Sequence, residues 1–140
     1  MGGYIVTQVA SLDQRLRAVA IASSPHDPRE HTLWEYRRFG FVTQWPALLA
    51  LRVSGLRLDD LPPERVIGKI APRPLLLICG AEDQLVPRWI TDRLYAAAGP
   101  NKRLLSVPHA GHGGYASADP TGYAGALAGF FSVLSASTSP

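Results

Sequence analysis

The sequence predicts an α/β fold built on parallel strands. Three apolar runs, at residues 16–22, 74–79 and 103–107, have the length and composition of strands buried in a sheet. Segments with the three- and four-residue apolar spacing of helices alternate with them, and such alternation is typical of parallel strands joined by right-handed crossovers. With 140 residues, 46% of them hydrophobic, and no internal repeat, the chain is expected to form one unit, with helices on both faces of the sheet.

The first half of the chain begins with a predicted helix and strand. In the helix, residues 4–13, apolar side chains recur at helical spacing. The strand at 16–22 (LRAVAIA) ends in turn-forming residues at 23–28.

An aromatic-rich segment follows the first strand. Five of the twelve aromatic residues lie between Trp34 and Trp45. Pro46 is predicted to open a helix over residues 47–53, because proline is tolerated in a first turn. The predicted elements of the second half are a helical turn at 64–69, a strand at 74–79 closed by Gly80, a helix at 88–98, a strand at 103–107 and a helix at 120–134.

Composition excludes several classes of protein. The net charge is +3, from 14 Lys and Arg against 11 Asp and Glu, and no basic run is longer than Arg37-Arg38. Nucleic-acid binders concentrate positive charge on one stripe, so no nucleic-acid partner is expected. Cys79, the only cysteine, can form neither an internal disulfide nor a zinc site by itself. No apolar run approaches the roughly 20 residues of a membrane span, and no secretory signal is visible, so we expect a cytoplasmic protein without a membrane partner.

Titratable side chains follow the second and third predicted strands. Asp83 stands in the loop after the second strand, and His112 stands in the glycine-rich loop after the third. If these parallel strands are neighbours, both loops lie at one edge of the sheet. A carboxylate there can hold an imidazole in one tautomer, and the imidazole can then act as a general base.

These motifs resemble the α/β-hydrolase family of serine hydrolases, which includes esterases, lipases and acyl-peptidases. The resemblance rests on the segment from Ile70 through LLLICG, on Glu82-Asp83-Gln84-Leu85-Val86-Pro87, and on the segment from Val107 to Gly113. It covers nearly the whole chain and is firmest over residues 70–131. It implies that Asp83 is the catalytic acid and His112 the catalytic histidine of a Ser-His-Asp triad.

The nucleophile that the family carries in Gly-x-Ser-x-Gly has no counterpart here. The family motif often continues as Met-Gly-Gly, so the resemblance places the missing serine just before Met1 and the oxyanion-hole N–H on Met1 itself. The chain would then be the C-terminal portion of the fold, with the N-terminal strands missing, and inactive alone. The other serines considered lack the motif: Ser11, Ser23, Ser24, Ser54, Ser106 and Ser117.

Other candidates have simpler interpretations. We interpret Cys79 as a buried structural thiol and His109 as a structural residue. Glu82 lies beside the acid but fits the Asp-x-x-Val-Pro register less well. His26 and His31 belong to no motif and are predicted to lie on the surface or on a lid.

The resemblance also implies a lid insertion at about residues 26–62, whose aromatics favour an apolar ester or amide substrate. No cofactor and no metal are expected. The alternative is a non-catalytic, hydrolase-like remnant that acts as a binding or dimerisation module. In it, the edge of the first strand, left uncovered, would pair with a partner or with a second copy of the chain.

Overall fold

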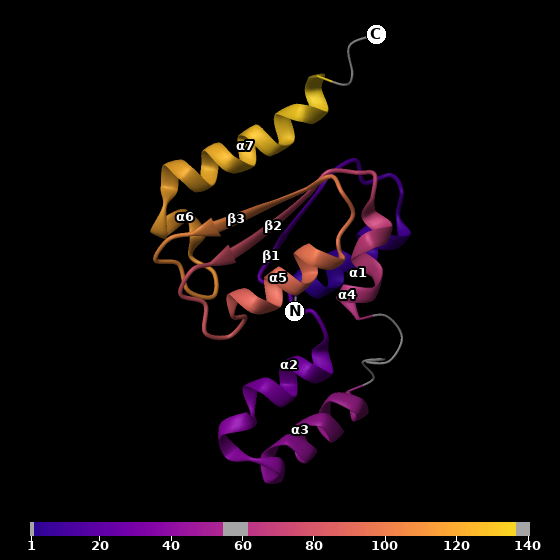
Figure 1. The fold of residues 1–140 in the computed structure, drawn as a ribbon, viewed down its shortest axis with the longest axis vertical. Helices are drawn as coiled ribbons and strands as arrows, with labels where there is room; N and C mark the ends of the chain where they lie inside the picture. The colour runs from indigo at the N-terminus through magenta and orange to yellow at the C-terminus, as the bar shows by residue number, and fades with distance from the viewer. Residues whose placement is uncertain (1, 55–61, 137–140) are drawn as a thin grey trace.

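The protein contains a parallel sheet of three strands, in the order β1-β2-β3, in a computed structural model that describes residues 2–54 and 62–136, with side chains up to residue 132 (Figure 1). The strands are β1 (Val19–Ala22), β2 (Leu75–Gly80) and β3 (Lys102–Val107). Ala22 pairs with Ile78, and Gly80 pairs with Val107. The predicted parallel α/β fold is confirmed, and β2 and β3 are neighbours.

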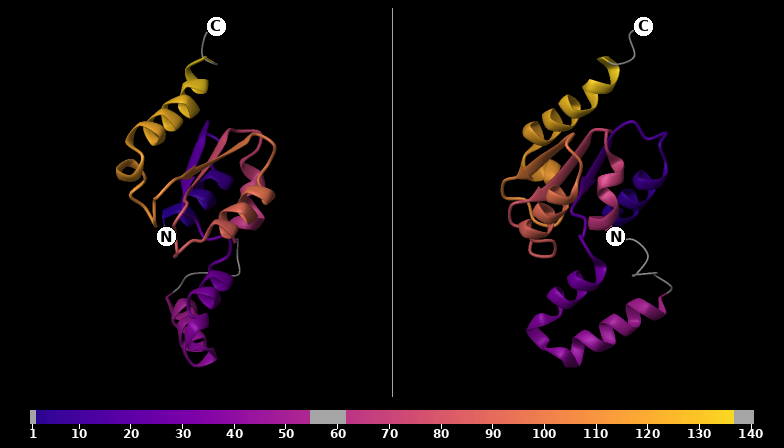
Figure 2. Two further views of the ribbon diagram at one scale, coloured as in Figure 1. Left: turned by 60° about the vertical axis from the view of Figure 1, so that its left-hand side comes forward. Right: turned by 45° about the vertical axis from the view of Figure 1, so that its right-hand side comes forward.

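Helices cover both faces of this sheet (Figures 1 and 2). The helical elements are α1 (Gly2–Leu12), α2 (Pro28–Glu35), η1 (Arg37–Phe39), α3 (Phe41–Val53), α4 (Pro63–Val66), η2 (Ile67–Ile70), α5 (Arg88–Ala97), α6 (Tyr115–Ala118) and α7 (Pro120–Ala136). Helices α1, α4 and α5 lie on one side of the sheet, and α6 and α7 lie on the other. This is the predicted three-layer arrangement.

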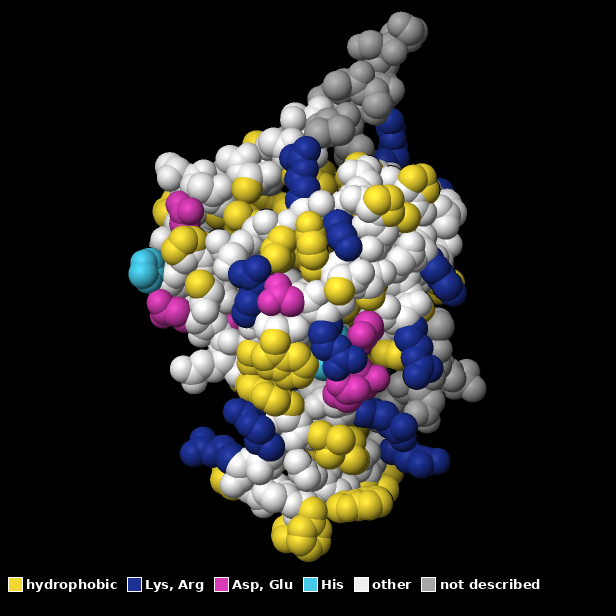
Figure 3. Space-filling view, in the orientation of Figure 1, with side chains coloured by type: hydrophobic (Ala, Val, Ile, Leu, Met, Phe, Trp, Pro, Cys, Tyr) yellow, Lys and Arg dark blue, Asp and Glu magenta, His cyan; other side chains and the backbone are white. Residues whose placement is uncertain are grey.

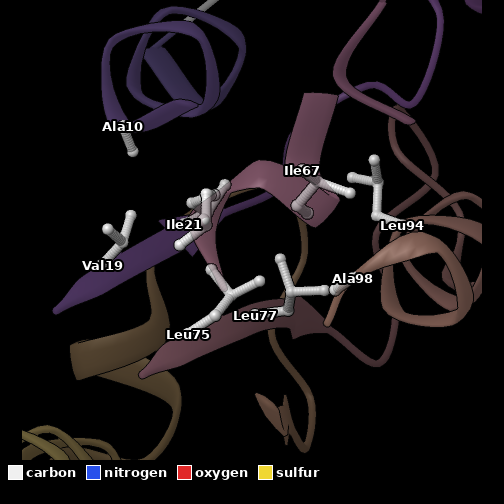
Figure 4. Close-up of a cluster of buried hydrophobic side chains, with 9 residues drawn as sticks. Ala10, Val19, Ile21, Ile67, Leu75, Leu77, Leu94 and Ala98 are labelled. Atoms are coloured by element: carbon white, nitrogen blue, oxygen red, sulfur yellow. The ribbon is translucent and has the colours of Figure 1, made fainter. Parts of the chain in front are cut away.

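Strand β2 forms the centre of the hydrophobic core because all six of its residues are buried. Its side chains alternate between the two faces, as the pleat of a strand requires. Leu75 and Leu77 pack with residues of α1 and α5 (Figure 4), whereas Leu76 and Ile78 pack with Phe130 of α7. Each such leucine contributes roughly 1.5–3 kcal/mol through burial, so this strand holds its two flanking loops in fixed positions.

Arg73 joins the end of α1 to the start of β2. Its guanidinium donates hydrogen bonds to the carbonyl oxygens of Ala10 (2.6 Å) and Asp13 (2.8 Å). Carbonyls at a helix C-terminus have no partner within the helix, so a cation at this position satisfies them. The N-terminal helix is therefore fixed to the central strand.

The boundary predicted at Pro46 is wrong. Helix α3 begins at Phe41, and Pro46 lies in its interior. Gly40, with a φ of 68°, turns the chain into the helix, and its carbonyl accepts hydrogen bonds from Thr43 and Gln44. Pro46 has no N–H for the carbonyl one turn earlier, yet the helix continues to Val53.

Helices α2 and α3 form a hairpin that projects beyond the sheet (Figures 1 and 2). The carboxylate of Asp27 caps α2 by accepting from the amide of Arg29 at 2.7 Å. None of the side chains of α2 or α3, which the structure describes in full, is buried. At the base of the hairpin, the amide of Glu64 donates to the carbonyl of His26 at 3.1 Å. The hairpin falls within the insertion predicted at 26–62, of which residues 55–61 lie outside the described residues.

Candidate active site

Asp83 lies in the loop after β2, and its side chain is fully buried. Its Oδ1 accepts hydrogen bonds from the backbone amides of Leu85 (2.9 Å) and Val86 (2.8 Å). Its Oδ2 accepts from the hydroxyl of Ser23 at 2.8 Å and lies 3.0 Å from Nδ1 of His112. The carboxylate therefore has four hydrogen-bond partners, two on each oxygen.

These contacts set the charge of Asp83. Burial raises the pKa of the carboxyl group, but the hydrogen bonds from Val86, Ser23 and His112 outweigh burial and hold the pKa below its usual value. The group is consequently an anion at neutral pH, despite being buried.

His112 reaches Asp83 from the loop after β3, and this loop packs closely on the end of β2. A Cβ atom on Gly80 would lie 2.3 Å from the carbonyl oxygens of Ala110 and Gly111, so only glycine fits there. The amide of Glu82 donates to the same Ala110 carbonyl at 2.9 Å. The two loops are thus held together by their backbones.

The tautomer of His112 follows from its partner. An ionised carboxylate can only accept hydrogen bonds, so Nδ1 of His112 carries the hydrogen that it donates to Asp83. In the neutral ring, Nε2 then keeps its lone pair. With 41% of its side chain exposed, His112 can receive a proton from a reacting group.

Ser23 and Tyr115 also belong to this site, and the sequence prediction missed both. The hydroxyl of Ser23 contacts Asp83 and the hydroxyl of Tyr115, and both residues are buried. Burial raises the pKa of Tyr115, so its hydroxyl stays protonated at neutral pH. Two features of the sequence could have pointed to them: Ser23 directly follows the first predicted strand, and Tyr115 comes three residues after His112.

A cavity of about 310 Å³ opens beside His112. Its walls include Pro25 before α2, Leu51 of α3, and Leu85 and Val86 after β2. Mostly apolar walls with a few polar groups are typical of small-molecule sites. The hairpin and the Asp83 loop therefore border one space next to His112.

His26 is buried, so of its two predicted placements, on the surface or on a lid, the surface placement is wrong. Its side chain is fully buried, its Nε2 lies 2.8 Å from Glu30, and its ring meets the edge of Trp89 on α5. The partner helix lies some sixty residues further along the chain, so the local sequence could not indicate this burial. His31 is half-buried, stacks on Trp34 and lines the cavity.

Arg93 of α5 connects the two ends of the hairpin. Its Nη1 lies 2.6 Å from Glu30 on α2, and its Nη2 lies 2.9 Å from Glu64 on α4. We call the set His26, Glu30, Glu64 and Arg93 the hairpin clasp. It fixes the base of the hairpin to the helix layer.

The remaining candidates are placed as follows. Cys79 is a buried free thiol, as predicted. His109 is 85% exposed and lies 3.1 Å from Glu82. Met1, predicted to supply an oxyanion-hole N–H, lies outside the described residues. In the part of the chain that the structure describes, no group of three His, Cys, Asp or Glu could hold a metal ion, and no helix could cross a membrane.

No family model matches the chain. Among curated proteins, the uncharacterized protein YfhR of Escherichia coli (strain K12) is 38% identical over 60 residues, which are 42% of this chain and 21% of that protein. The uncharacterized protein Rv2307c of Mycobacterium tuberculosis (strain H37Rv) is 41% identical over 63 residues, 44% of this chain and 22% of that protein. The matches span about a fifth of the length of these relatives.

Solved structures similar to the chain include α/β hydrolases and esterases. An α/β hydrolase from a lagoon-sediment metagenome is 18% identical with a TM-score of 0.64, over 96% of this chain and 58% of that one. An esterase of Pyrococcus furiosus is 17% identical with a TM-score of 0.70, and the match covers 93% of this chain and 50% of the esterase. The serine hydrolase CarC, involved in carbazole degradation, is 20% identical with a TM-score of 0.62, and the match covers 94% of this chain and 60% of CarC. The chain therefore has the α/β-hydrolase fold and spans about half the length of these proteins.

Proposed function

We propose that this chain, which has part of the α/β-hydrolase fold, is the C-terminal portion of a serine hydrolase that cleaves carboxylic esters or amides. The observation that carries the proposal is the hydrogen bond between Asp83 and His112, 3.0 Å long, at the carboxyl ends of neighbouring parallel strands. An acid and an imidazole in this relation form two members of a Ser-His-Asp triad.

The geometry supports a defined path for the proton. A serine hydroxyl gives its proton to Nε2 of His112 while its oxygen attacks the substrate carbonyl. Asp83 stabilises the imidazolium that forms, and His112 then passes the proton to the departing alcohol or amine. The bond to the alcohol or amine breaks and leaves the acyl group on the serine oxygen. Water then gives a proton to His112 and attacks this acyl group, the acyl–serine bond breaks, and the serine oxygen takes the proton back as the carboxylic acid leaves. The serine would come from just before Met1, and the backbone N–H of Met1 would stabilise the tetrahedral oxyanion.

The cavity supports a compact, apolar substrate group. Its volume of about 310 Å³ is near the lower end of the range for small-molecule pockets. We propose that the α2–α3 hairpin acts as the lid over it, because Thr32 and Leu51 from the hairpin face the same cavity as His112. Ester and amide substrates share this machinery, and the walls favour neither.

The test compares the chain with an N-terminally extended form. We expect the 140 residues alone to give negligible turnover of a nitrophenyl ester, and the codons before Met1 to encode Gly-x-Ser in frame. In the extended protein, His112→Ala and Asp83→Asn should each lower kcat by at least about 10³-fold. Turnover by the 140-residue chain that His112→Ala abolishes, or a stop codon before Met1, would contradict the proposal.

A binding or dimerisation module is the second candidate, and one observation favours it. Among the described residues, β1 pairs only with β2, so its other edge has no strand beside it. An open edge of this kind can pair with another chain. A discrete dimer in sedimentation, together with an upstream stop codon, would favour this function over hydrolysis.

A further inference from the structure

We propose that the hydroxyl groups of Ser23 and Tyr115 form a relay that fixes Asp83 to the loop carrying His112, which makes both of them positioning residues for the base. The inference rests on the proposed function, and it adds two residues to the triad members already named. Ser23 lines the cavity beside His112 and Tyr115 does not, and the role proposed for both is to position the base rather than to accept a proton from the substrate.

The direction of each hydrogen bond follows from chemistry. Asp83 is ionised and can only accept, so the hydroxyl proton of Ser23 points to its Oδ2. The Ser23 oxygen, having used its only proton, must accept from the hydroxyl of Tyr115. Tyr115 itself begins α6, directly after the loop that carries His112.

The relay forms a closed ring. From Tyr115 it passes through Ser23 to Asp83 and on to His112, and the backbone from His112 to Tyr115 closes it. The ring joins the carboxyl ends of β1, β2 and β3, because Ser23, Asp83 and His112 follow these strands in that order. Movement of the His112 loop would therefore break the direct bond from His112 to Asp83 and also the link from Tyr115 through Ser23.

Burial makes the relay effective. Ser23 and Tyr115 are each 8% exposed, so little water can replace their hydrogen bonds. The ring of Tyr115 packs against Tyr123 and belongs to the core cluster that includes Phe130. In such surroundings a hydrogen bond to a charged group is stronger than the same bond exposed to water.

The backbone at Ser23 supports a specific role for its side chain. Its φ is 40°, in the left-handed region that is unfavourable for most residues but open to glycine. A serine at this position is therefore less favourable for the backbone than a glycine would be. The hydrogen bond of its hydroxyl to Asp83 offsets that cost.

Ser23 is not a hidden nucleophile in this arrangement. Its proton is directed to Asp83, whereas a nucleophilic serine would donate to Nε2 of His112. The neighbouring Ser24 is also buried, but its hydroxyl donates to the carbonyl of Pro25 and takes no part in the ring. Ser24 thus provides a matched control.

The experiment uses NMR on the isotope-labelled 140-residue chain, because it requires no catalytic activity. The Asp83 carboxyl carbon reports the pKa of that group, and the ring nitrogens of His112 report its tautomer. The test variants are Ser23→Ala, Ser23→Gly and Tyr115→Phe. Ser23→Gly removes the hydroxyl without backbone strain and covers the case in which the alanine variant does not fold. The controls are Ser24→Ala and Tyr123→Phe.

We expect both Ser23 variants to raise the pKa of Asp83 and to shift the neutral His112 nitrogens from the Nδ1–H pattern toward a mixture of tautomers. Tyr115→Phe should do the same to a smaller extent, and the controls should match the wild type. If Ser23→Gly and Tyr115→Phe also match the wild type, the relay does not exist.

A second readout separates the relay from the proposed function. In the extended protein, Ser23→Gly should lower kcat by about 10-fold with little change in KM, since about 1.4 kcal/mol of positioning is lost. An unchanged kcat in an active enzyme would overturn the positioning role. If the extended protein is inactive but the NMR shifts occur, the hydrolase proposal fails and the relay remains as a structural device.

Discussion

At the scale of single residues, the charge of Asp83 links stability to pH. The folded-state pKa of this carboxyl lies below its ordinary value. The stabilisation it provides is therefore fully present above the unfolded value, near pH 3.9, and is lost as the pH falls through the lower folded value.

Replacing Asp83 tests this link. At pH 7, Asp83→Asn should lower the free energy of unfolding by about 2 kcal/mol, because the amide is a weaker acceptor for the buried hydroxyl of Ser23 and for His112. The difference from the wild type should shrink between pH 5 and pH 2. Urea unfolding of both proteins across this pH range measures the difference in unfolding free energy. A difference that does not change with pH would show that the carboxylate charge does not stabilise the fold.

The contact between Gly80 and the His112 loop gives a second prediction. Gly80→Ala would force a methyl group against two backbone carbonyls that cannot rotate away, so we expect a loss of about 3 kcal/mol in unfolding free energy. Gly111→Ala is the control, because a Cβ there meets nothing within 4 Å. Equal losses in the two variants would contradict the close packing.

Some residues of the candidate site could be predicted from the sequence, and others could not. Asp83 and His112 could be predicted because each stands in a local motif at the end of a recognisable strand. The bonds of Ser23 and Tyr115 join positions 92 residues apart, and no local pattern records such a contact. The wrong prediction for His26 has the same cause, since Trp89 of α5 helps to cover it.

At the scale of elements, strands and long helices were predicted more accurately than the hairpin. The helices predicted at 4–13 and 88–98 occur as α1 and α5 with boundaries shifted by a residue or two. Helix α3 was misjudged because Pro46 is a strong helix-start signal, whereas Gly40 provides the actual turn into the helix. The preference of proline for the first turn of a helix is a local effect. Here the turn at Gly40, well before the proline, decides where the helix begins.

The hairpin clasp leads to a prediction about the motion of α2. Arg93→Ala should remove both ion pairs at the base of the hairpin and increase amide hydrogen exchange in Pro28–Glu35. Because these groups are partly exposed, global stability should fall by only about 1 kcal/mol. Arg88→Ala breaks an exposed pair with Asp92 on the same helix and is the matched control. Unchanged exchange in α2 would mean that the clasp does not hold the hairpin.

At the scale of the whole molecule, apolar side chains gather at the end formed by the hairpin (Figure 3). Helix α3 exposes a row of them, with Phe41 at 72%, Trp45 at 71% and Leu49 at 61%. Arginine side chains of the hairpin lie beside this row. Exposed apolar surface of this kind promotes association between chains.

We expect the isolated chain to self-associate as its concentration rises, which sedimentation velocity would detect. The double variant Phe41→Glu/Trp45→Glu should shift the distribution toward the monomer, because it removes two apolar side chains and would force two carboxylates to lose water in the contact. Ala50→Glu adds charge at another exposed position of α3 and controls for charge alone. A distribution unaffected by the double variant would locate the contact elsewhere, the open edge of β1 being the first alternative.

The bond between the amide of Glu64 and the carbonyl of His26 means that the chain leaves the sheet and returns to it at one point. The α2–α3 hairpin lies between these two residues, and β1 and β2 pair directly with each other without a contribution from it. A different hairpin would therefore change the walls that Thr32 and Leu51 give the cavity, without touching the loops that carry Asp83 and His112. Under the proposed function, the shape of the pocket could then vary independently of the acid and the base.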